Sequence, residues 1–145
     1  MIVIASDHAG FPLKQELAEH LRAKGVAFED IGCYSTESVD YPEYAARAAR
    51  GVADGTYDRG ILVCGTGLGM AMAAGKIRGI RCAAVSESYS AEMSRSHNDA
   101  NMIALGGRVI GPELAKQIVD VFLSTEFLGG KHQRRVDMIG ALETE

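Results

Sequence analysis

The chain has 145 residues, enough for one compact domain but not for two with sizeable cores. Its composition, 47% hydrophobic and 23% charged residues, excludes disorder, and no apolar stretch approaches the roughly 18 residues that a membrane-spanning helix needs. A net charge of −4 gives no electrostatic footprint for nucleic acid. We therefore expect neither a nucleic-acid nor a membrane partner.

The N-terminal third of the chain alternates between strand-like and helix-like patterns. Residues 2–5 and 26–31 are short apolar runs typical of buried parallel strands. Between them, leucines repeat every four residues up to Gly25, which predicts an amphipathic helix that ends at a glycine. Pro42 fits the first turn of the next helix. The inner face of that helix is predicted to consist of Tyr44, Ala45, Ala48, Ala49 and Val52.

The alternation continues through the rest of the chain. Strands are predicted over residues 60–64, 81–85 and 102–105, separated by helices over residues 68–76 and 87–96. The apolar face of a further helix, which opens at Pro112, is predicted to consist of Leu114, Ile118, Val121 and Phe122. This order of elements predicts an α/β fold with a five-stranded parallel sheet and right-handed crossovers.

The sequence ends in a basic segment. Gly129–Gly130 is typical of a hinge, and the short helix predicted after it gathers Lys131, His132, Arg134 and Arg135. In an acidic protein such a cluster suggests an anionic partner, and Arg135 together with Arg108 has the geometry to bind a phosphate bidentately. A solvated helix face is equally compatible with this spacing.

Polar and glycine residues follow three of the predicted strands, in the segments Ser6–Gly10, Cys64–Gly69 and Gly106–Arg108. Ligands of open α/β sheets bind beyond the carboxyl ends of the strands. We therefore expect the functional site at this edge of the sheet, with a candidate there for each group that binds the ligand or acts on it.

The glycine loop after residues 60–64 is the strongest local feature. Gly65, Gly67 and Gly69 leave successive amide groups free to face an anion. Met70 stands where a dinucleotide-binding or P-loop motif needs glycine, so the loop is neither of these. The alternative is a tight strand-to-helix turn, which explains one glycine well and three poorly.

The three cysteines form no C-x-x-C pair, so neither a disulfide framework nor a zinc knuckle is indicated. Cys64, at the mouth of the glycine loop, is either a base or nucleophile favoured as a thiolate by neighbouring amides, or a small buried residue. Cys82 is expected to be buried, and Cys33 carries no functional signal. Because the first residues also lack the pattern of a secretory signal, we expect a cytoplasmic protein.

The four histidines show no metal-binding spacing, so no metal is predicted. His20 is expected to be solvated on the polar side of the first helix. His8 and His97 have polar neighbours, and His97, in S-R-S-H-N-D-A-N, is the better acid–base candidate because an imidazole titrates near neutrality. The alternative role of His97 is a cap at the helix C-terminus.

Six stretches together resemble the ribose-5-phosphate isomerase B family, which includes the allose- and galactose-6-phosphate isomerases. They occur in the order of the family and span nearly the whole chain. The matching stretches are ASDHAGFPLK (Ala5–Lys14), DYPEYA (Asp40–Ala45), CGTGLGM (Cys64–Met70), SRSHNDAN (Ser94–Asn101), GGRVIG (Gly106–Gly111) and GGKHQRRV (Gly129–Val136).

The resemblance implies a three-layer Rossmann-like domain over residues 1–145 that isomerises a phosphosugar without metal or cofactor. It implies a homodimer or tetramer with active sites at the subunit interface, where the basic tail, residues 129–145, packs on the neighbouring subunit. Some relatives use a glutamate as the base at the position of Met70. Methionine cannot take a proton, which places this chain among the members that use a cysteine.

By position, Cys64 would be the base that forms a cis-enediolate and His97 would open the sugar ring. The loop residues Gly65, Thr66, Gly67, Leu68 and Gly69 would stabilise the oxygen of the enediolate. Sugar hydroxyls and phosphate would be bound by Asp7, His8, Asn98, Arg108 and Arg135. Lys131 stands where relatives often have arginine, so its phosphate contact would be that of a point charge.

The implied reaction interconverts D-ribose 5-phosphate and D-ribulose 5-phosphate. Alternatives within the same chemistry are allose 6-phosphate, galactose 6-phosphate or a tetrose phosphate as substrate. An alternative of another class is a non-catalytic phosphosugar-binding module, which would have no use for both Cys64 and His97.

Overall fold

The fold is built on a five-stranded sheet whose paired strands are all parallel, in the order β2-β1-β3-β5-β4. The computed structural model describes all residues from 1 to 145. The strands are β1 (Ile2–Ser6), β2 (Phe28–Asp30), β3 (Gly60–Cys64), β4 (Cys82–Ala84) and β5 (Met102–Gly106). The three central strands are fully buried, whereas the edge strands β2 and β4 are partly exposed and shorter than predicted.

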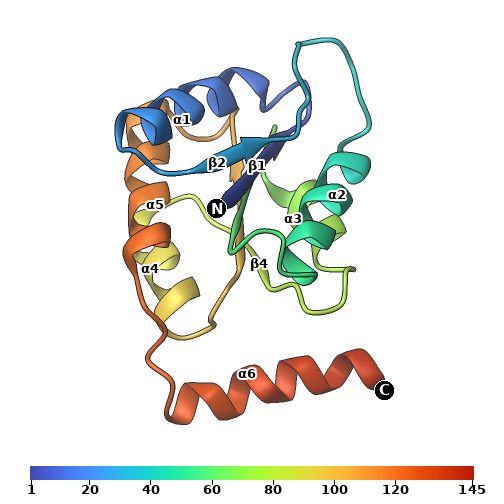
Figure 1. The fold of residues 1–145 in the computed structure, drawn as a ribbon, viewed down its shortest axis with the longest axis vertical. Coiled ribbons are helices and arrows are strands. Elements are labelled where there is room, and N and C mark those ends of the chain that lie inside the picture. Colours follow the sequence, from blue (N-terminus) through green and yellow to red (C-terminus); the bar gives the residue numbers. More distant parts are fainter.

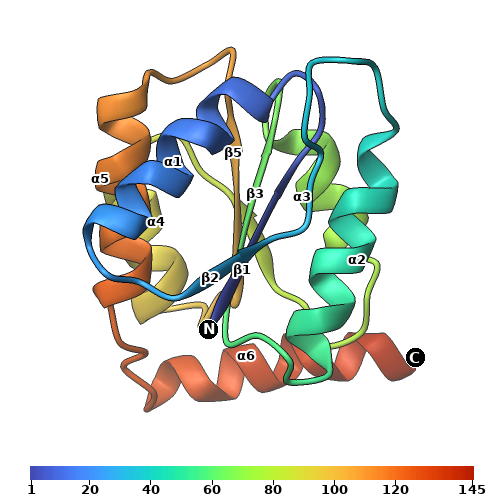
Figure 2. The same ribbon diagram turned by 45° about the horizontal axis from the view of Figure 1, so that its top comes forward.

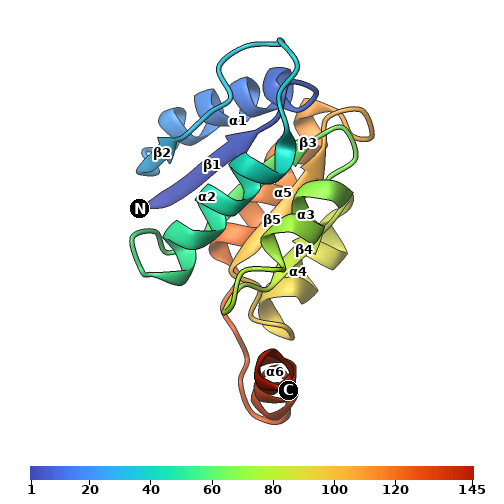
Figure 3. The same cartoon turned by 90° about the vertical axis from the view of Figure 1, so that its right-hand side faces the viewer.

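Helices cover both faces of the sheet and form the two outer layers (Figures 1 and 3). The helices are α1 (Phe11–Ala23), α2 (Tyr41–Ala53), α3 (Leu68–Ala74), α4 (Ser88–Ser96), α5 (Pro112–Ser124) and α6 (Lys131–Ala141), followed by a short 3₁₀ helix (Leu142–Thr144). Helices α1, α4 and α5 lie on one face, and α2 and α3 lie on the other. The prediction of a three-layer, Rossmann-like α/β fold is confirmed.

The alternation of side chains along each strand divides the core between the two faces. In β1, Ile2 and Ile4 pack with α1 and α5, while Val3 and Ala5 pack with α2 and α3. The predicted inner face of α2 is confirmed for Ala45, Ala48, Ala49 and Val52, which are buried, and Tyr44 packs against them partly buried. On α5 the buried residues are Ala115, Ile118, Val119 and Phe122, so the prediction is confirmed for Ile118 and Phe122. Leu114 and Val121 are only partly buried, at the edge of the same core.

Helix α6 lies apart from the three layers, beside the end of the sheet where the strands begin (Figures 1 and 2). Val136 is its one buried residue, and Met138 and Ile139 are exposed. The predicted helical tail is therefore present, while its packing on a neighbouring subunit stays a prediction. None of the helices is both long and apolar enough to cross a membrane.

The adjacent strands β1 and β3 mark the point where the sheet changes winding direction. The chain leaves β1 for α1 on one face and leaves β3 for α3 on the opposite face. Such a switch point opens a crevice at the carboxyl ends of the two strands, which is the usual place for a ligand in this architecture.

Candidate active site

The loop after β1 supplies the first two polar groups of this crevice. Asp7 is only 6% exposed, and its Oδ1 accepts a hydrogen bond of 2.9 Å from the amide of Gly10 at the start of α1. A Cβ atom on Gly10 would lie 2.2 Å from the carbonyl oxygen of Val63. Glycine is therefore required for this loop to lie directly against the end of β3.

The second polar group of this loop, His8, is oriented by a backbone contact. The amide of Val39 donates to its Nδ1 at 3.1 Å. Because Nδ1 accepts, the neutral imidazole carries its proton on Nε2. His8 therefore presents a hydrogen-bond donor as its second ring nitrogen.

The segment that supplies Val39 is anchored by a buried lysine that sequence reasoning missed. The Lys14 side chain is fully buried, and its Nζ donates to Asp30 Oδ1 and to the carbonyl oxygen of Cys33, both at 2.6 Å. The only signal of this role in the sequence is the place of Lys14 at the end of the ASDHAGFPLK motif.

Cys64 ends β3 and is 4% exposed. Its Sγ accepts a hydrogen bond of 3.1 Å from the amide of Gly67. The amides of Gly65, Thr66 and Gly69 have no acceptor within the chain. The thiol therefore lies beside several unpaired N–H donors, the arrangement that stabilises a developing negative charge.

The three glycines of this loop have different structural reasons. Gly67 has a left-handed φ of +81°, and a Cβ on Gly69 would lie 2.6 Å from the Tyr41 ring. A Cβ on Gly65 would meet nothing closer than 3.6 Å, in the side chain of Arg108. The tight-turn explanation therefore holds for Gly67, whereas the space at Gly65 stays open toward the crevice.

The loop after β5 brings a cation to the same place. The amides of Gly107 and Arg108 donate to the carbonyl oxygens of Cys64 and Gly65, at 2.8 and 3.0 Å. The exposed guanidinium of Arg108 pairs with no carboxylate of the chain. It is therefore available to an anionic ligand.

These groups line one pocket of about 320 Å³. Its lining residues are Asp7, His8, Ala9, Tyr41, Cys64, Gly65, Thr66, Gly69 and Arg108. Leu68 is exposed at the start of α3, and its amide donates to Thr66 Oγ1 at 3.3 Å. Sequence reasoning missed Tyr41, although it lies in the DYPEYA motif. A larger hollow of about 420 Å³, beside Met1, is mostly apolar and holds none of the candidate residues.

Four predicted site residues, His97, Asn98, Lys131 and Arg135, lie elsewhere. His97 and Asn98 follow α4 and precede β5, so they lie at the amino end of the strands. The expectation that every needed group lies at one sheet edge is therefore wrong. The expectation fails because of the direction of the chain. Residues before a strand and residues after it lie at opposite ends of a parallel sheet.

This second group has an internal order of its own. The rings of His97 and His132 stack with centroids 4.1 Å apart and an interplanar angle of 11°. Burial, followed by the charges of His97, Lys131 and Arg135, lowers the pKa of His132. The start of helix α6 therefore lies beside the end of α4.

The structure departs from two further predictions, those for His20 and Cys82. His20 is not solvated: its side chain is 15% exposed, and its Nε2 lies 2.7 Å from Asp120 Oδ1. Cys82 lies on the edge strand β4 and is partly exposed, and burial raises the pKa of its thiol to about 12. No three His, Cys, Asp or Glu side chains lie close enough together to hold a metal ion.

Comparison with known proteins places this geometry in a family. A sequence model described as Ribose/Galactose Isomerase matches residues 2–139. The chain belongs to the ribose/galactose isomerase family. It is 51% identical to ribose-5-phosphate isomerase B of Escherichia coli strain K12 over 142 residues, which are 98% of this chain and 95% of that protein. The predicted family is thus confirmed.

Solved structures of this isomerase family have the same fold. Ribose-5-phosphate isomerase B of Clostridium thermocellum superposes with a TM-score of 0.97 at 51% identity, covering 99% of this chain and 97% of that chain. Ribose-5-phosphate isomerase B of Mycoplasma genitalium, solved with bound ribulose 5-phosphate, gives a TM-score of 0.94 at 42% identity, covering 99% and 96%. The similarity therefore extends over the whole chain.

Proposed function

We propose that the protein is a metal-independent aldose–ketose isomerase that interconverts D-ribose 5-phosphate and D-ribulose 5-phosphate. The observation that carries this proposal is the Cys64 thiol beside the unpaired amides of Gly65 and Thr66. The activity named for the similar proteins and the sugar phosphate bound to one of them support the choice of substrate. The free cysteines fit a reducing compartment, and we place the enzyme in the cytoplasm.

In this mechanism the Cys64 thiolate removes the proton from C2 of the open-chain aldose and returns it to C1. The electron pair left by the C2–H bond forms a cis-enediolate, whose negative oxygen is stabilised by the amides of Gly65 and Thr66. A proton moves from the C2 hydroxyl to the C1 oxygen, so the isomerisation is balanced without an oxidant. Asp7 and His8 bind hydroxyl or phosphate oxygens of the substrate, and Arg108 binds the phosphate.

The site requires a second copy of the chain. His97, which would protonate the ring oxygen, and Arg135, which would bind phosphate, are absent from the pocket of their own chain. We propose a homodimer in which His97, Asn98, Lys131 and Arg135 of one protomer complete the pocket of its partner. The exposed Met138 and Ile139 on α6 are suited to burial in such an interface.

The base is tested with Cys64→Ala, and Cys82→Ala serves as the matched control because both thiols belong to the same side of the core. Cys64→Ala is expected to lower kcat by about 10²–10⁴, the usual contribution of a positioned base. Solvent deuterium should also enter the substrate pool of the wild type. Undiminished turnover by Cys64→Ala would disprove its role, and absence of both turnover and exchange in the wild type would favour a binding module.

Sharing of the site is tested by co-expressing Cys64→Ala and His97→Ala chains, each strongly impaired alone with ribose 5-phosphate as substrate. A mixed dimer has one site with both defects and one with neither, so random pairing should restore about one quarter of wild-type activity. Complete inactivity of the mixture, with mixed dimers verified by mass spectrometry, would contradict a shared site.

Comparison of kcat/KM for ribose, allose, galactose and erythrulose phosphates identifies the preferred substrate.

A further inference from the structure

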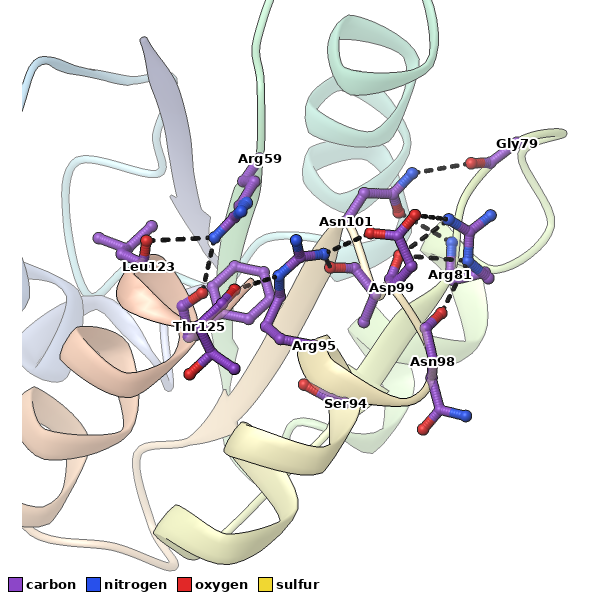
Figure 4. Close-up of polar contacts among 12 residues, drawn as sticks. Arg59, Gly79, Arg81, Ser94, Arg95, Asn98, Asp99, Asn101, Leu123 and Thr125 are labelled. Carbon is purple, nitrogen blue, oxygen red and sulfur yellow. Dashed lines mark hydrogen bonds and ion pairs between the residues drawn. The ribbon is translucent and has the colours of Figure 1, made fainter. Parts of the chain in front are cut away.

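A cluster of charged side chains surrounds Asp99, the residue that follows His97 and Asn98 in the chain (Figure 4). Asp99 Oδ1 lies 2.8 Å from Arg95 Nη1, and its Oδ2 lies 3.4 Å from Arg81 Nη2. The Arg95 side chain is only 6% exposed. One carboxylate is therefore held between two guanidinium groups, one from the end of α4 and one from the residue just before β4.

The backbone at Asp99 is left-handed, and its carboxylate makes contacts that this conformation does not require. Asp99 is the only residue other than glycine with a positive φ, at +46°. Glycine adopts this left-handed conformation at no steric cost, and asparagine adopts it readily. A glycine would also satisfy the turn, and aspartate itself is tolerated there, so what distinguishes Asp99 is the contact of its carboxylate with Arg95 and Arg81.

The same guanidinium groups hold the main chain of this segment. Arg81 donates to the carbonyl oxygens of Asn98 and Asp99, at 3.1 Å from Nε and 2.8 Å from Nη2. Arg95 donates to the carbonyl oxygens of Ala100 at 2.8 Å and Thr125 at 3.2 Å. Three consecutive peptide carbonyls, at 98, 99 and 100, are thus fixed by arginines that Asp99 holds in place.

The side chains of His97 and Asn98 project from this fixed segment and take no part in the charged cluster. The amide of Asn98 is exposed, makes no hydrogen bond within the chain, and points away from the cluster (Figure 4). The imidazole of His97 instead stacks on His132. The cluster therefore fixes the backbone from which the side chains of His97 and Asn98 extend, and it forms no hydrogen bond with their polar groups.

We propose that Asp99 is a positioning residue of the active site: its carboxylate, held between Arg95 and Arg81, orients His97 and Asn98 toward the pocket of the partner. The inference rests on the proposed function, because orientation matters only if these two side chains meet substrate. A misplacement of about 1 Å at a reacting group can cost about 10²-fold in rate.

The test compares Asp99→Asn, which keeps the shape and the turn, with Asp99→Gly, which suits the turn but has no side chain. Asp120→Asn is the matched control, since Asp120 also pairs two basic side chains but lies on α5, outside the candidate site. Initial rates are measured from both substrates. Ribulose 5-phosphate is open-chain, because the oxygen needed to close its five-membered ring carries the phosphate, so ring opening is required only from ribose 5-phosphate.

Both Asp99 variants are expected to lose about 10–100-fold in kcat from ribose 5-phosphate, with a smaller loss of kcat from ribulose 5-phosphate; kcat/KM falls by the same factor in both directions, because the equilibrium constant fixes the ratio of the two values. Asp120→Asn should retain wild-type rates. Because Asp99 acts through His97, adding Asp99→Asn to His97→Ala should cost little more from ribose 5-phosphate. Wild-type rates for Asp99→Gly, or equal losses of kcat in both directions that are additive with His97→Ala, would overturn the proposal in favour of a turn-forming or general structural role.

The two proposals fail in different ways. An inactive wild type, or a fully active His97→Ala variant, would refute the proposed function and with it the role of Asp99. An impaired His97→Ala variant beside a fully active Asp99→Asn variant would overturn only the present inference.

Discussion

The open space at Gly65 separates the requirements of folding from those of catalysis. A Cβ at Gly65 would lie 3.6 Å from Arg108, which is an ordinary contact distance, whereas a Cβ at Gly10 would lie 2.2 Å from the Val63 carbonyl oxygen. Gly65→Ala and Gly10→Ala therefore add the same methyl group to two loops of one pocket with different consequences.

The structure gives a direction and size for each effect. Gly65→Ala should leave the free energy of unfolding within about 1 kcal/mol of the wild type, because alanine fits and the unfolded chain loses freedom. The methyl group would enter the space that the unpaired amides face, and loss of one such donor typically lowers kcat by about 10²–10³. Gly10→Ala should destabilise the fold by about 1–3 kcal/mol or more, through a backbone clash.

Urea denaturation and a kinetic assay with ribose 5-phosphate measure the two effects separately. The expected result is a folded, poorly active Gly65→Ala protein and a markedly less stable Gly10→Ala protein. Wild-type kcat/KM for Gly65→Ala would show that the substrate oxygen does not approach these amides, and the reasoning from the glycine loop would be refuted.

Three further outcomes are expected. Lys14→Met should lower the free energy of unfolding by about 3 kcal/mol, since it leaves the Asp30 carboxylate without its buried partner, and adding Asp30→Asn should recover part of it; an unchanged urea midpoint would contradict this. Exhaustive chelation should leave turnover unchanged, because a thiolate and amides perform the chemistry; loss restored by a divalent cation would refute it. Burial raises the pKa of Asp120, but hydrogen bonds from Lys24 and His20 outweigh it and keep this pKa below the ordinary value of 3.8. The stabilising effect of the Asp120 carboxylate should therefore be present above pH 4 and lost at lower pH. The difference in Tm between wild type and Asp120→Asn should therefore shrink on acidification, and a constant difference would contradict the assignment.

The sequence predicted the sheet, its layers and the half of the site that follows β1, β3 and β5. These succeeded because period and strand direction are local properties, and the segment after a parallel strand always lies at its carboxyl end. The edge strands were predicted too long because apolar runs such as residues 26–31 do not reveal how far a neighbouring strand extends.

The rest of the site depends on distances that a sequence does not encode locally. The fixed place of His97 at the opposite end of the sheet follows from topology, and the pairing of His20 with Asp120 joins helices that are far apart in the chain. Lys14 was missed because a lysine among leucines has no periodicity of its own. The different reasons for Gly65 and Gly67 became clear only when the neighbouring atoms were known.

The unpaired donors around Cys64 belong to the main chain, and this affects how the protein can diverge. A point mutation can delete any side chain, but only proline removes an amide hydrogen. The donors themselves therefore survive amino-acid exchange where the backbone keeps its course, although a side chain added at Gly65 would block access to them. Tyr41 and His8, in contrast, line the same pocket through side chains that a point mutation can replace. Replacement of pocket side chains can therefore change which sugar phosphate binds, while the main-chain amides continue to stabilise negative charge.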